Sequence, residues 1–209
     1  DVAVNQTLII KPSNSSPYQY DTFKTSETIR FEKVANNLGI DFHHIEDNYT
    51  DFNREKLIPY QVCDRGPALA IGDLNQDGKE DIFFGGSKFI SSKIYLQTDS
   101  TFVQSKFTSI LNDSIKEEVS AVIEDFSGDS KNDLFIASGG NDFFGNADPL
   151  LDSYFVQTDS SFIKKALPDY FQNASVIKPY DYDSDGDLDI FIAGHTITNQ
   201  FGKPATSYL

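Results

Sequence analysis

The stretch that decides the fold is residues 181–194, DYDSDGDLDIFIAG, in which an acidic nine-residue loop runs directly into an apolar segment. Two earlier stretches have the same form: DLNQDGKED at 73–81 is followed by IFFGG, and DFSGDSKND at 125–133 is followed by LFIAS. The loops start 52 and 56 residues apart. This spacing indicates that each loop belongs to a structural unit that occurs three times.

The loops carry oxygen-bearing side chains at positions 1, 3, 5 and 9, and oxygen is the donor that Ca²⁺ prefers. An EF-hand would need a bidentate Glu at position 12, but Phe84, Ile136 and Ile192 stand there, inside the apolar segments. We expect position 7 to contribute a backbone carbonyl. The predicted ligands are Asp73, Asn75, Asp77, Lys79 and Asp81 in the first loop, Asp125, Ser127, Asp129, Lys131 and Asp133 in the second, and Asp181, Asp183, Asp185, Asp187 and Asp189 in the third.

The three predicted calcium sites differ in strength. The third loop has carboxylates at all four of positions 1, 3, 5 and 9 and Gly186 at position 6, where glycine allows a left-handed turn, so we predict that it binds Ca²⁺ most tightly. The first loop has the neutral Asn75 at position 3. The second has Ser127 at position 3 and Ser130 in place of glycine, so we predict that it is the weakest of up to three Ca²⁺ sites. The alternative is that all three are Asp/Asn/Gly turns without an ion.

Apolar runs around each loop predict four short strands in a unit of about 50 residues. The phrases KIYLQTDSTFVQ (93–104) and SYFVQTDSSFIK (153–164) have alternating apolar positions on both sides of an Asp-Ser turn, which predicts hairpins. Four antiparallel strands form one blade of a β-propeller. We therefore predict an all-β fold with blades at about 67–117, 118–172 and 173–209, the last truncated after two strands.

Two and a half blades are too few to close a ring of four to eight blades, so we expect a partial, open propeller. The run that starts at Thr28 matches the outer strand of a preceding unit, and it predicts an outer strand followed by an irregular segment over residues 21–66. We interpret the chain as a piece of a longer protein. Its open sheet edges predict pairing with another chain.

Composition narrows the function classes. The formal net charge is −15, and the chain has no basic stripe to displace counterions, which argues against a nucleic-acid partner. No apolar run approaches 18 residues, so we do not expect a membrane-spanning segment. The single cysteine, Cys63, rules out an internal disulfide framework, and its apolar surroundings predict a small core residue.

The loops, their spacing and their flanking strands resemble the FG-GAP/VCBS repeat family, whose pattern D-x-[DN]-x-D-G-x-x-D marks a propeller blade. The resemblance covers about Ala68 to Gly194, and the second loop departs from the pattern at Ser127 and Ser130. A looser similarity to bacterial surface proteins implies that residues 1–20 end an ASPIC/UnbV-like module. The resemblance implies a secreted or surface-exposed protein whose propeller binds Ca²⁺ and serves adhesion or recognition, usually without catalysis.

We therefore predict an extracellular, calcium-binding module that recognises a protein or glycan at the cell surface and is not an enzyme. The loop surrounds its ion with protein oxygens, which leaves no open position for a substrate and makes the ion structural. The alternative is a propeller domain of a polysaccharide-processing enzyme, with paired carboxylates at Glu46, Asp47 and Asp51.

Other residues have weaker patterns. The adjacent pair His43 and His44 suits zinc or acid/base chemistry by residue type, but neighbouring strand residues point to opposite faces, which favours a packing role. Phe143, Phe144 and Tyr170 could stack on sugars, but we expect them in the blade core.

Overall fold

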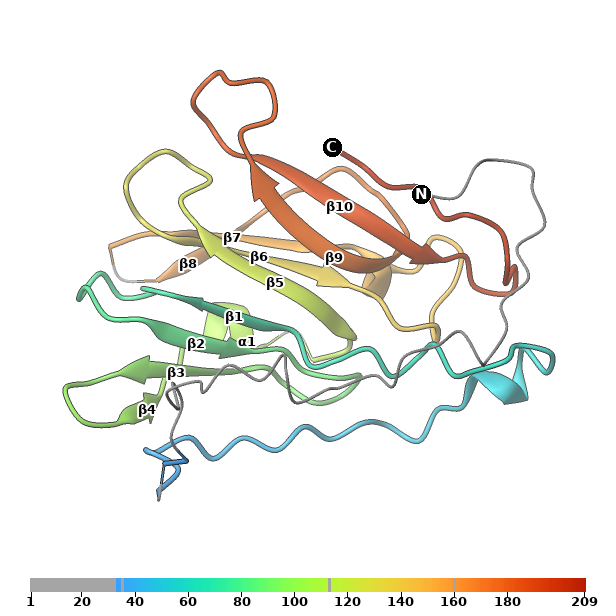
Figure 1. The fold of residues 1–209 in the computed structure, drawn as a ribbon, viewed down its shortest axis with the longest axis horizontal. Coiled ribbons are helices and arrows are strands. Elements are labelled where there is room, and N and C mark those ends of the chain that lie inside the picture. The colour runs from blue at the N-terminus through green and yellow to red at the C-terminus, as the bar shows by residue number, and fades with distance from the viewer. Residues whose placement is uncertain (1–32, 35, 113, 160) are drawn as a thin grey trace, which may run out of the picture. The chain divides into compact units, whose positions relative to one another are not determined.

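The computed structural model describes residues 33–209 except residues 35, 113 and 160 (Figure 1). The chain divides into two compact units, Asp1–Ala35 and Asn36–Leu209, and all elements described below belong to the second. The predicted ASPIC/UnbV-like end at 1–20 and the strand that starts at Thr28 lie outside the described residues, apart from the end of that strand.

The described residues form three antiparallel sheets (Figure 1). The first has the order β1-β2-β3-β4, the second β5-β6-β7-β8, and the third pairs β9 with β10. The strands are β1 Leu69–Gly72, β2 Asp81–Phe84, β3 Lys93–Gln97, β4 Phe102–Gln104, β5 Glu118–Glu124, β6 Asp133–Ser138, β7 Ser153–Gln157, β8 Phe162–Lys165, β9 Asn173–Tyr180 and β10 Asp189–Thr196. The helical turns are η3 Asp51–Asn53, α1 Thr108–Leu111 and η4 Asp148–Leu150.

The two four-stranded sheets follow the predicted pattern of strands and turns. Each acidic loop joins the first two strands of a sheet, and the predicted hairpins are confirmed: β3 pairs with β4 and β7 pairs with β8. In both hairpins the turn is closed by a backbone bond, from Thr98 N to Thr101 O and from Thr158 N to Ser161 O, each 2.7 Å long. The all-β prediction is therefore confirmed. None of the three sheets closes on itself within the described part of the chain.

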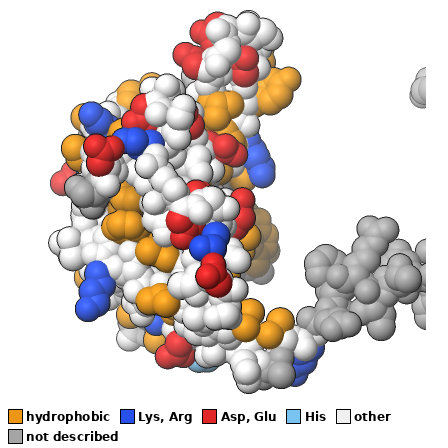
Figure 2. Space-filling model, turned by 90° about the vertical axis from the view of Figure 1, so that its left-hand side faces the viewer, with side chains coloured by type: hydrophobic (Ala, Val, Ile, Leu, Met, Phe, Trp, Pro, Cys, Tyr) orange, Lys and Arg blue, Asp and Glu red, His pale blue; other side chains and the backbone are white. Residues whose placement is uncertain are grey.

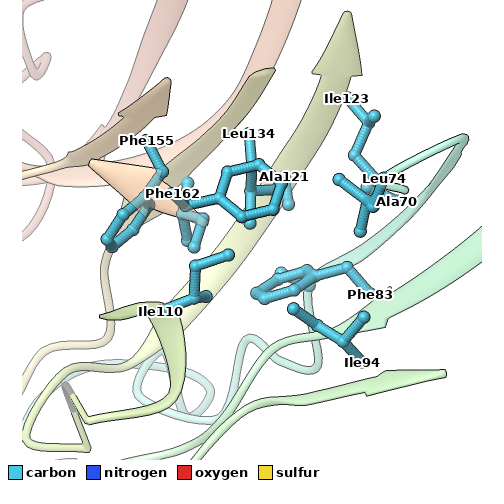
Figure 3. Close-up of a cluster of buried hydrophobic side chains, with 12 residues drawn as sticks. Ala70, Leu74, Phe83, Ile94, Ile110, Ala121, Ile123, Leu134, Phe155 and Phe162 are labelled. Carbon is cyan, nitrogen blue, oxygen red and sulfur yellow. The ribbon is translucent and has the colours of Figure 1, made fainter. Parts of the chain in front are cut away.

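The second sheet is buried on both faces because the other two sheets pack against it. Successive side chains of a strand point to opposite faces, so β6 divides its apolar residues between two cores. Leu134 and Ile136 join a cluster with the first sheet, and Figure 3 shows Leu134 there. Phe135 and Ala137 join a second cluster with residues of β9 and β10. This double burial explains the uninterrupted apolar run of β6.

The first core lies between the first and second sheets and is closed by α1 (Figure 3). Its largest fully buried side chains include Phe83, Ile94, Leu134 and Phe155. The sheets approach closely at Gly72, where an added Cβ would lie 2.4 Å from the Ile123 side chain. We attribute the glycine at the end of β1 to this contact.

The segment between residues 36 and 68 contains only one short helical turn, η3, among its described residues. It lies along the first sheet: Phe102 N donates to Leu38 O at 2.7 Å, and the Tyr95 hydroxyl donates to Asp41 O at 2.7 Å. Phe42 stacks on Phe84 with ring centroids 4.2 Å apart. The segment therefore covers part of the first sheet with irregular chain.

The outer edge of β10 pairs with a residue close to the end of the chain. Ile192 and Tyr208 exchange two backbone hydrogen bonds of 2.9 Å as an isolated bridge. Among the described residues, no helix has the length and apolar character needed to cross a membrane.

Candidate functional site

The three acidic loops lie at the same end of their sheets, between the first and second strands. Figure 2 views this end and shows Asp and Glu side chains in separate groups. The same hydrogen bonds recur in each loop. The carboxylate at position 1 accepts the backbone N–H groups of positions 5 and 6, with distances of 3.2 and 2.7 Å at Asp73, 3.1 and 2.8 Å at Asp125, and 3.2 and 3.2 Å at Asp181.

These bonds require left-handed backbone at position 6 and at position 4. Position 6 has φ of 79° at Gly78, 68° at Ser130 and 98° at Gly186. The prediction that Ser130 occupies a conformation suited to glycine is confirmed. The left-handed position 4 was not predicted, because it is Gln76 in the first loop and Ser184 in the third, with φ of 62° and 64°. Only the second loop places a glycine, Gly128, at position 4, with φ of 72°.

The carboxylate at position 9 links its loop to the sheet. One oxygen of Asp81 accepts Leu74 N at 2.9 Å and the other accepts Gln97 N of β3 at 2.8 Å. Asp133 likewise accepts Ser127 N and Gln157 N of β7, both at 2.9 Å. Both aspartates are fully buried, and burial raises the pKa of Asp81. In the first two loops, the aspartate at position 9 therefore has a structural role, because it hydrogen-bonds both its own loop and the third strand of the sheet.

The third loop gathers its carboxylates most closely. Asp181, Asp183 and Asp189 each have an oxygen within 4.8 Å of the others. Oxygens bound to one Ca²⁺ at 2.3–2.6 Å lie at most about 5 Å apart, so this set fits such an ion. Asp185 accepts Asp187 N at 3.1 Å, and this bond is the main cause that lowers the pKa of Asp185. Among the described residues, neither of the other loops brings three acidic side chains together in this way.

In the first and second loops, position 7 is a lysine whose ammonium group pairs with nearby aspartates. Lys79 Nζ lies 3.7 Å from Asp77 and 3.2 Å from Asp99, and Lys131 Nζ lies 2.5 Å from Asp159. Asp99 and Asp159 belong to the turns of the β3–β4 and β7–β8 hairpins. The third loop carries Asp187 at this position instead.

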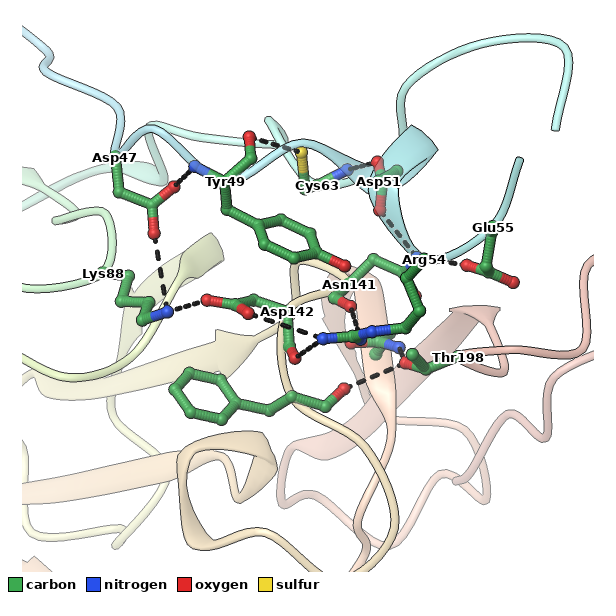
Figure 4. Close-up of polar contacts among 12 residues, drawn as sticks. Asp47, Tyr49, Asp51, Arg54, Glu55, Cys63, Lys88, Asn141, Asp142 and Thr198 are labelled. Atoms are coloured by element: carbon green, nitrogen blue, oxygen red, sulfur yellow. Dashed lines mark hydrogen bonds and ion pairs between the residues drawn. The ribbon is translucent and has the colours of Figure 1, made fainter. Parts of the chain in front are cut away.

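A second polar region lies at the opposite end of the sheets, around η3 and the β6–β7 loop (Figure 4). Asp51 is fully buried and accepts three hydrogen bonds: Val62 N at 2.6 Å, Cys63 N at 2.8 Å and Asn141 Nδ2 at 2.7 Å. Arg54 donates to the carbonyls of Asn141 and Asp142, both at 2.8 Å. These contacts fix the irregular segment to the second sheet. Asp51, one carboxylate of the enzyme alternative, is therefore not open to a substrate.

The other residues of that alternative are held by contacts with neighbouring side chains. Glu46 pairs with His44, and Asp47 lies 3.7 Å from Lys88 Nζ, which also pairs with Asp142. His43 is exposed, so the two histidines do not point to one site, as their alternation predicts. Cys63 is buried, as predicted, and burial is the main cause that raises the pKa of its thiol to about 12.

Glu117 is a buried carboxyl group at this end of the sheets. Its side chain is 8% exposed, and its Oε1 has no hydrogen-bond partner in the described part of the chain. Burial, and then the negative charges of Glu46, Asp47 and Asp64, raise its pKa to about 8, while the Lys88 backbone N–H opposes them. Lys88 also brings its ammonium group to this cluster.

We predict that Glu117→Gln stabilises the protein at alkaline pH. In the folded protein, Glu117 keeps its proton up to about pH 8, but the unfolded chain loses it near pH 4.5. Stability therefore falls as pH rises through this window. Urea unfolding should give nearly equal stabilities at pH 5 and a gain of about 4 kcal/mol for the variant at pH 8.5. Glu80→Gln, at an exposed glutamate, controls for lost surface charge. A difference between Glu117→Gln and wild type that does not change with pH contradicts the prediction.

Aromatic residues near this end differ from the prediction. Phe144 is 58% exposed and Tyr170 is 39% exposed, so the prediction that they belong to the core is wrong. Phe144 lies in the β6–β7 loop, 5.1 Å from the Arg54 guanidinium, and Tyr170 stacks on Tyr208 with centroids 4.0 Å apart. Both residues lie in loops rather than in strands, and an alternating sequence pattern cannot distinguish a loop aromatic residue from a strand residue of the core.

Comparison of the chain with protein-family models found no match, and comparison with curated protein sequences found none either.

Proposed function

We propose that the chain is part of an extracellular β-propeller of the FG-GAP/VCBS type whose loops bind Ca²⁺ and whose blades form a recognition module at the cell surface. The observation that carries the proposal is the convergence of Asp181, Asp183 and Asp189 in the third loop. The sheets with the order expected for blades and the loop hydrogen bonds that recur three times support it. The blades bind a protein or glycan, and the module is not an enzyme.

The bound ion would have a structural role. Asp181, Asp183 and Asp189 would hold it, and a backbone carbonyl of the loop would complete the shell. The ion would supply charge that offsets the repulsion among these carboxylates. The hydrogen bonds that Asp181 accepts from Asp185 N and Gly186 N already shape the loop around that position. The first loop has a neutral ligand at Asn75 and the second has Ser127, which supports the order third, first, second in affinity.

We predict that Ca²⁺ raises the melting temperature. A ligand at about 100 times its Kd contributes about 2.7 kcal/mol, which corresponds to a rise of about 5–10 °C for a domain of this size. Differential scanning calorimetry in Ca²⁺ and in EDTA measures the rise. Asp183→Asn should lose most of it, because it removes a charged ligand from the third loop. Asp129→Asn, in the second loop, should lose little.

The control is Asp169→Asn, which changes an exposed aspartate outside the loops and should keep the full response to Ca²⁺. Equal melting temperatures of the wild-type protein in Ca²⁺ and EDTA would refute the stabilising role of the ion. An Asp129→Asn variant more impaired than Asp183→Asn would overturn the order of the sites.

A further inference from the structure

A pocket of about 500 Å³ lies at the end of the sheets opposite the acidic loops. It is bounded by the β6–β7 loop, by the start of β9 and by the chain after β10. Its volume is within the range of about 300–1,000 Å³ that small-molecule sites occupy. Its lining includes Phe144, Gln172, Asn173, Thr196, Thr198 and Tyr208.

The lining of this pocket is uncharged although the chain carries a net charge of −15. Amide side chains, threonine hydroxyls and aromatic rings make up most of it, and none of its described lining residues is Asp, Glu, Lys, Arg or His. Amides and hydroxyls can both donate and accept hydrogen bonds. A pocket wall of this kind is complementary to a neutral ligand that has both hydrogen-bond donors and acceptors. It offers no charged side chain to neutralise an ionic ligand.

Unsatisfied polar atoms concentrate in this wall. In the part of the chain that the structure describes, eight buried side-chain atoms lack a hydrogen-bond partner, and four of them belong to the pocket: Nε2 and Oε1 of Gln172, Oδ1 of Asn173 and Oγ1 of Thr196. A buried polar group left unpaired costs about 1–3 kcal/mol. The Gln172 amide can turn toward a ligand without breaking a hydrogen bond, because it makes none.

The neighbouring groups hold Asn173 in place. Asn173 Nδ2 donates to the Thr198 hydroxyl at 2.8 Å, and that hydroxyl donates to Phe143 O at 2.9 Å. The Asn173 amide is therefore oriented, and its oxygen is the atom that remains to accept a bond. A fixed acceptor costs a ligand less ordering entropy than a mobile one.

Aromatic surface completes the pocket. Phe144 is 58% exposed, and Tyr208 is backed by its stacking partner Tyr170 at 4.0 Å. An exposed ring beside amide and hydroxyl groups suits a molecule with apolar C–H faces and hydroxyl edges. Sugars combine these two surfaces, and ions do not.

We propose that this pocket binds a neutral carbohydrate, one or two sugar residues of a glycan. The inference rests on the proposed recognition function and names its ligand class and its site. Gln172, Asn173 and Thr196 hydrogen-bond the sugar hydroxyls, and Phe144 and Tyr208 pack against its C–H face. An acidic sugar is disfavoured, because no Lys, Arg or His is among the described residues that line the pocket and the chain is strongly negative.

The test is saturation-transfer NMR and calorimetric titration in saturating Ca²⁺ with glucose, galactose, mannose, N-acetylglucosamine and cellobiose. Glucuronate serves as the acidic probe and N-acetylasparagine amide as a peptide-like probe. We expect at least one neutral sugar to bind and glucuronate to bind at least tenfold more weakly than it. Absence of binding by every neutral sugar overturns the inference, as does stronger binding of glucuronate or of the amide.

Variants distinguish this site from non-specific contact. Gln172→Leu and Thr196→Val remove unpaired polar atoms, so both should fold with unchanged or higher melting temperature and bind the sugar at least tenfold more weakly. Thr196→Val is the readout if Gln172→Leu does not fold. Phe144→Ala should also weaken binding. Phe89→Ala, at a similarly exposed phenylalanine of the β2–β3 loop, should not. Sugar binding that survives both Gln172→Leu and Thr196→Val overturns the site.

The same samples separate this inference from the proposal on which it rests. Melting in Ca²⁺ and EDTA reports the acidic loops, and sugar binding reports the pocket. A protein that Ca²⁺ stabilises but that binds no sugar refutes the pocket and leaves the calcium-binding module in place. A protein that binds sugar but has the same melting temperature in Ca²⁺ and EDTA refutes the stabilising role of the ion and leaves the sugar-binding pocket in place.

Discussion

Replacing Asp51 with alanine should lower the free energy of unfolding by about 3–5 kcal/mol, the range for removing one partner of a buried charged network. The carboxylate is fully buried and accepts hydrogen bonds from Val62 N, Cys63 N and Asn141 Nδ2. Alanine leaves these three donors without their acceptor and opens a cavity. The irregular segment would then lose one of its hydrogen bonds to the β6–β7 loop and two within itself. Urea denaturation at neutral pH, monitored by tyrosine fluorescence, measures the loss.

Two further variants test the cause. Asp51→Asn keeps one oxygen that can accept the two backbone donors, so its loss should be about half that of Asp51→Ala. Asp41→Ala removes an aspartate whose side chain is 84% exposed and should change stability by less than about 0.5 kcal/mol. A loss below 1 kcal/mol in Asp51→Ala would mean that the segment is held by its other contacts.

The strands of this protein could be predicted because they follow simple periodicities. The alternation in the two hairpins predicted their turns, and the continuous apolar run of residues 134–137 is explained by burial on both faces of β6. The irregular segment could not be predicted in the same way. Its position depends on single contacts such as those of Asp51, and one buried aspartate has no pattern in sequence.

The acidic loops were predicted in part. The spacing identified the position-1 carboxylates and the left-handed position 6, and Ser130 obeys that geometry without a glycine. The spacing could not show which donors the last carboxylate meets, because Gln97 and Gln157 are distant in sequence. The uncharged pocket gave no signal at all. Gln172 and Thr196 are neutral polar residues at strand ends, and only the fold brings them together.

The geometry of the last carboxylate leads to a prediction that separates fold from ion binding. Asp133→Ala should lower the free energy of unfolding by about 3–4 kcal/mol, in Ca²⁺ and in EDTA alike. Asp133 is fully buried, and it accepts Ser127 N and Gln157 N at 2.9 Å and the Tyr154 hydroxyl at 3.0 Å. The loss is independent of Ca²⁺ because these three donors belong to the protein. Chemical denaturation in both buffers measures it.

Asp129→Ala in the same loop is the matched control, because Asp129 is exposed and, within the described part of the chain, its carboxylate accepts one hydrogen bond, from Lys131 N at 3.0 Å. Its cost should be below about 1 kcal/mol in EDTA. If Asp133 served only as a calcium ligand, Asp133→Ala would be harmless in EDTA and costly in Ca²⁺, the opposite of what its hydrogen bonds require. A large, calcium-independent loss would therefore assign the closing aspartate of the second loop to the fold, and would explain why that position is acidic even where the rest of the loop is poor in ligands.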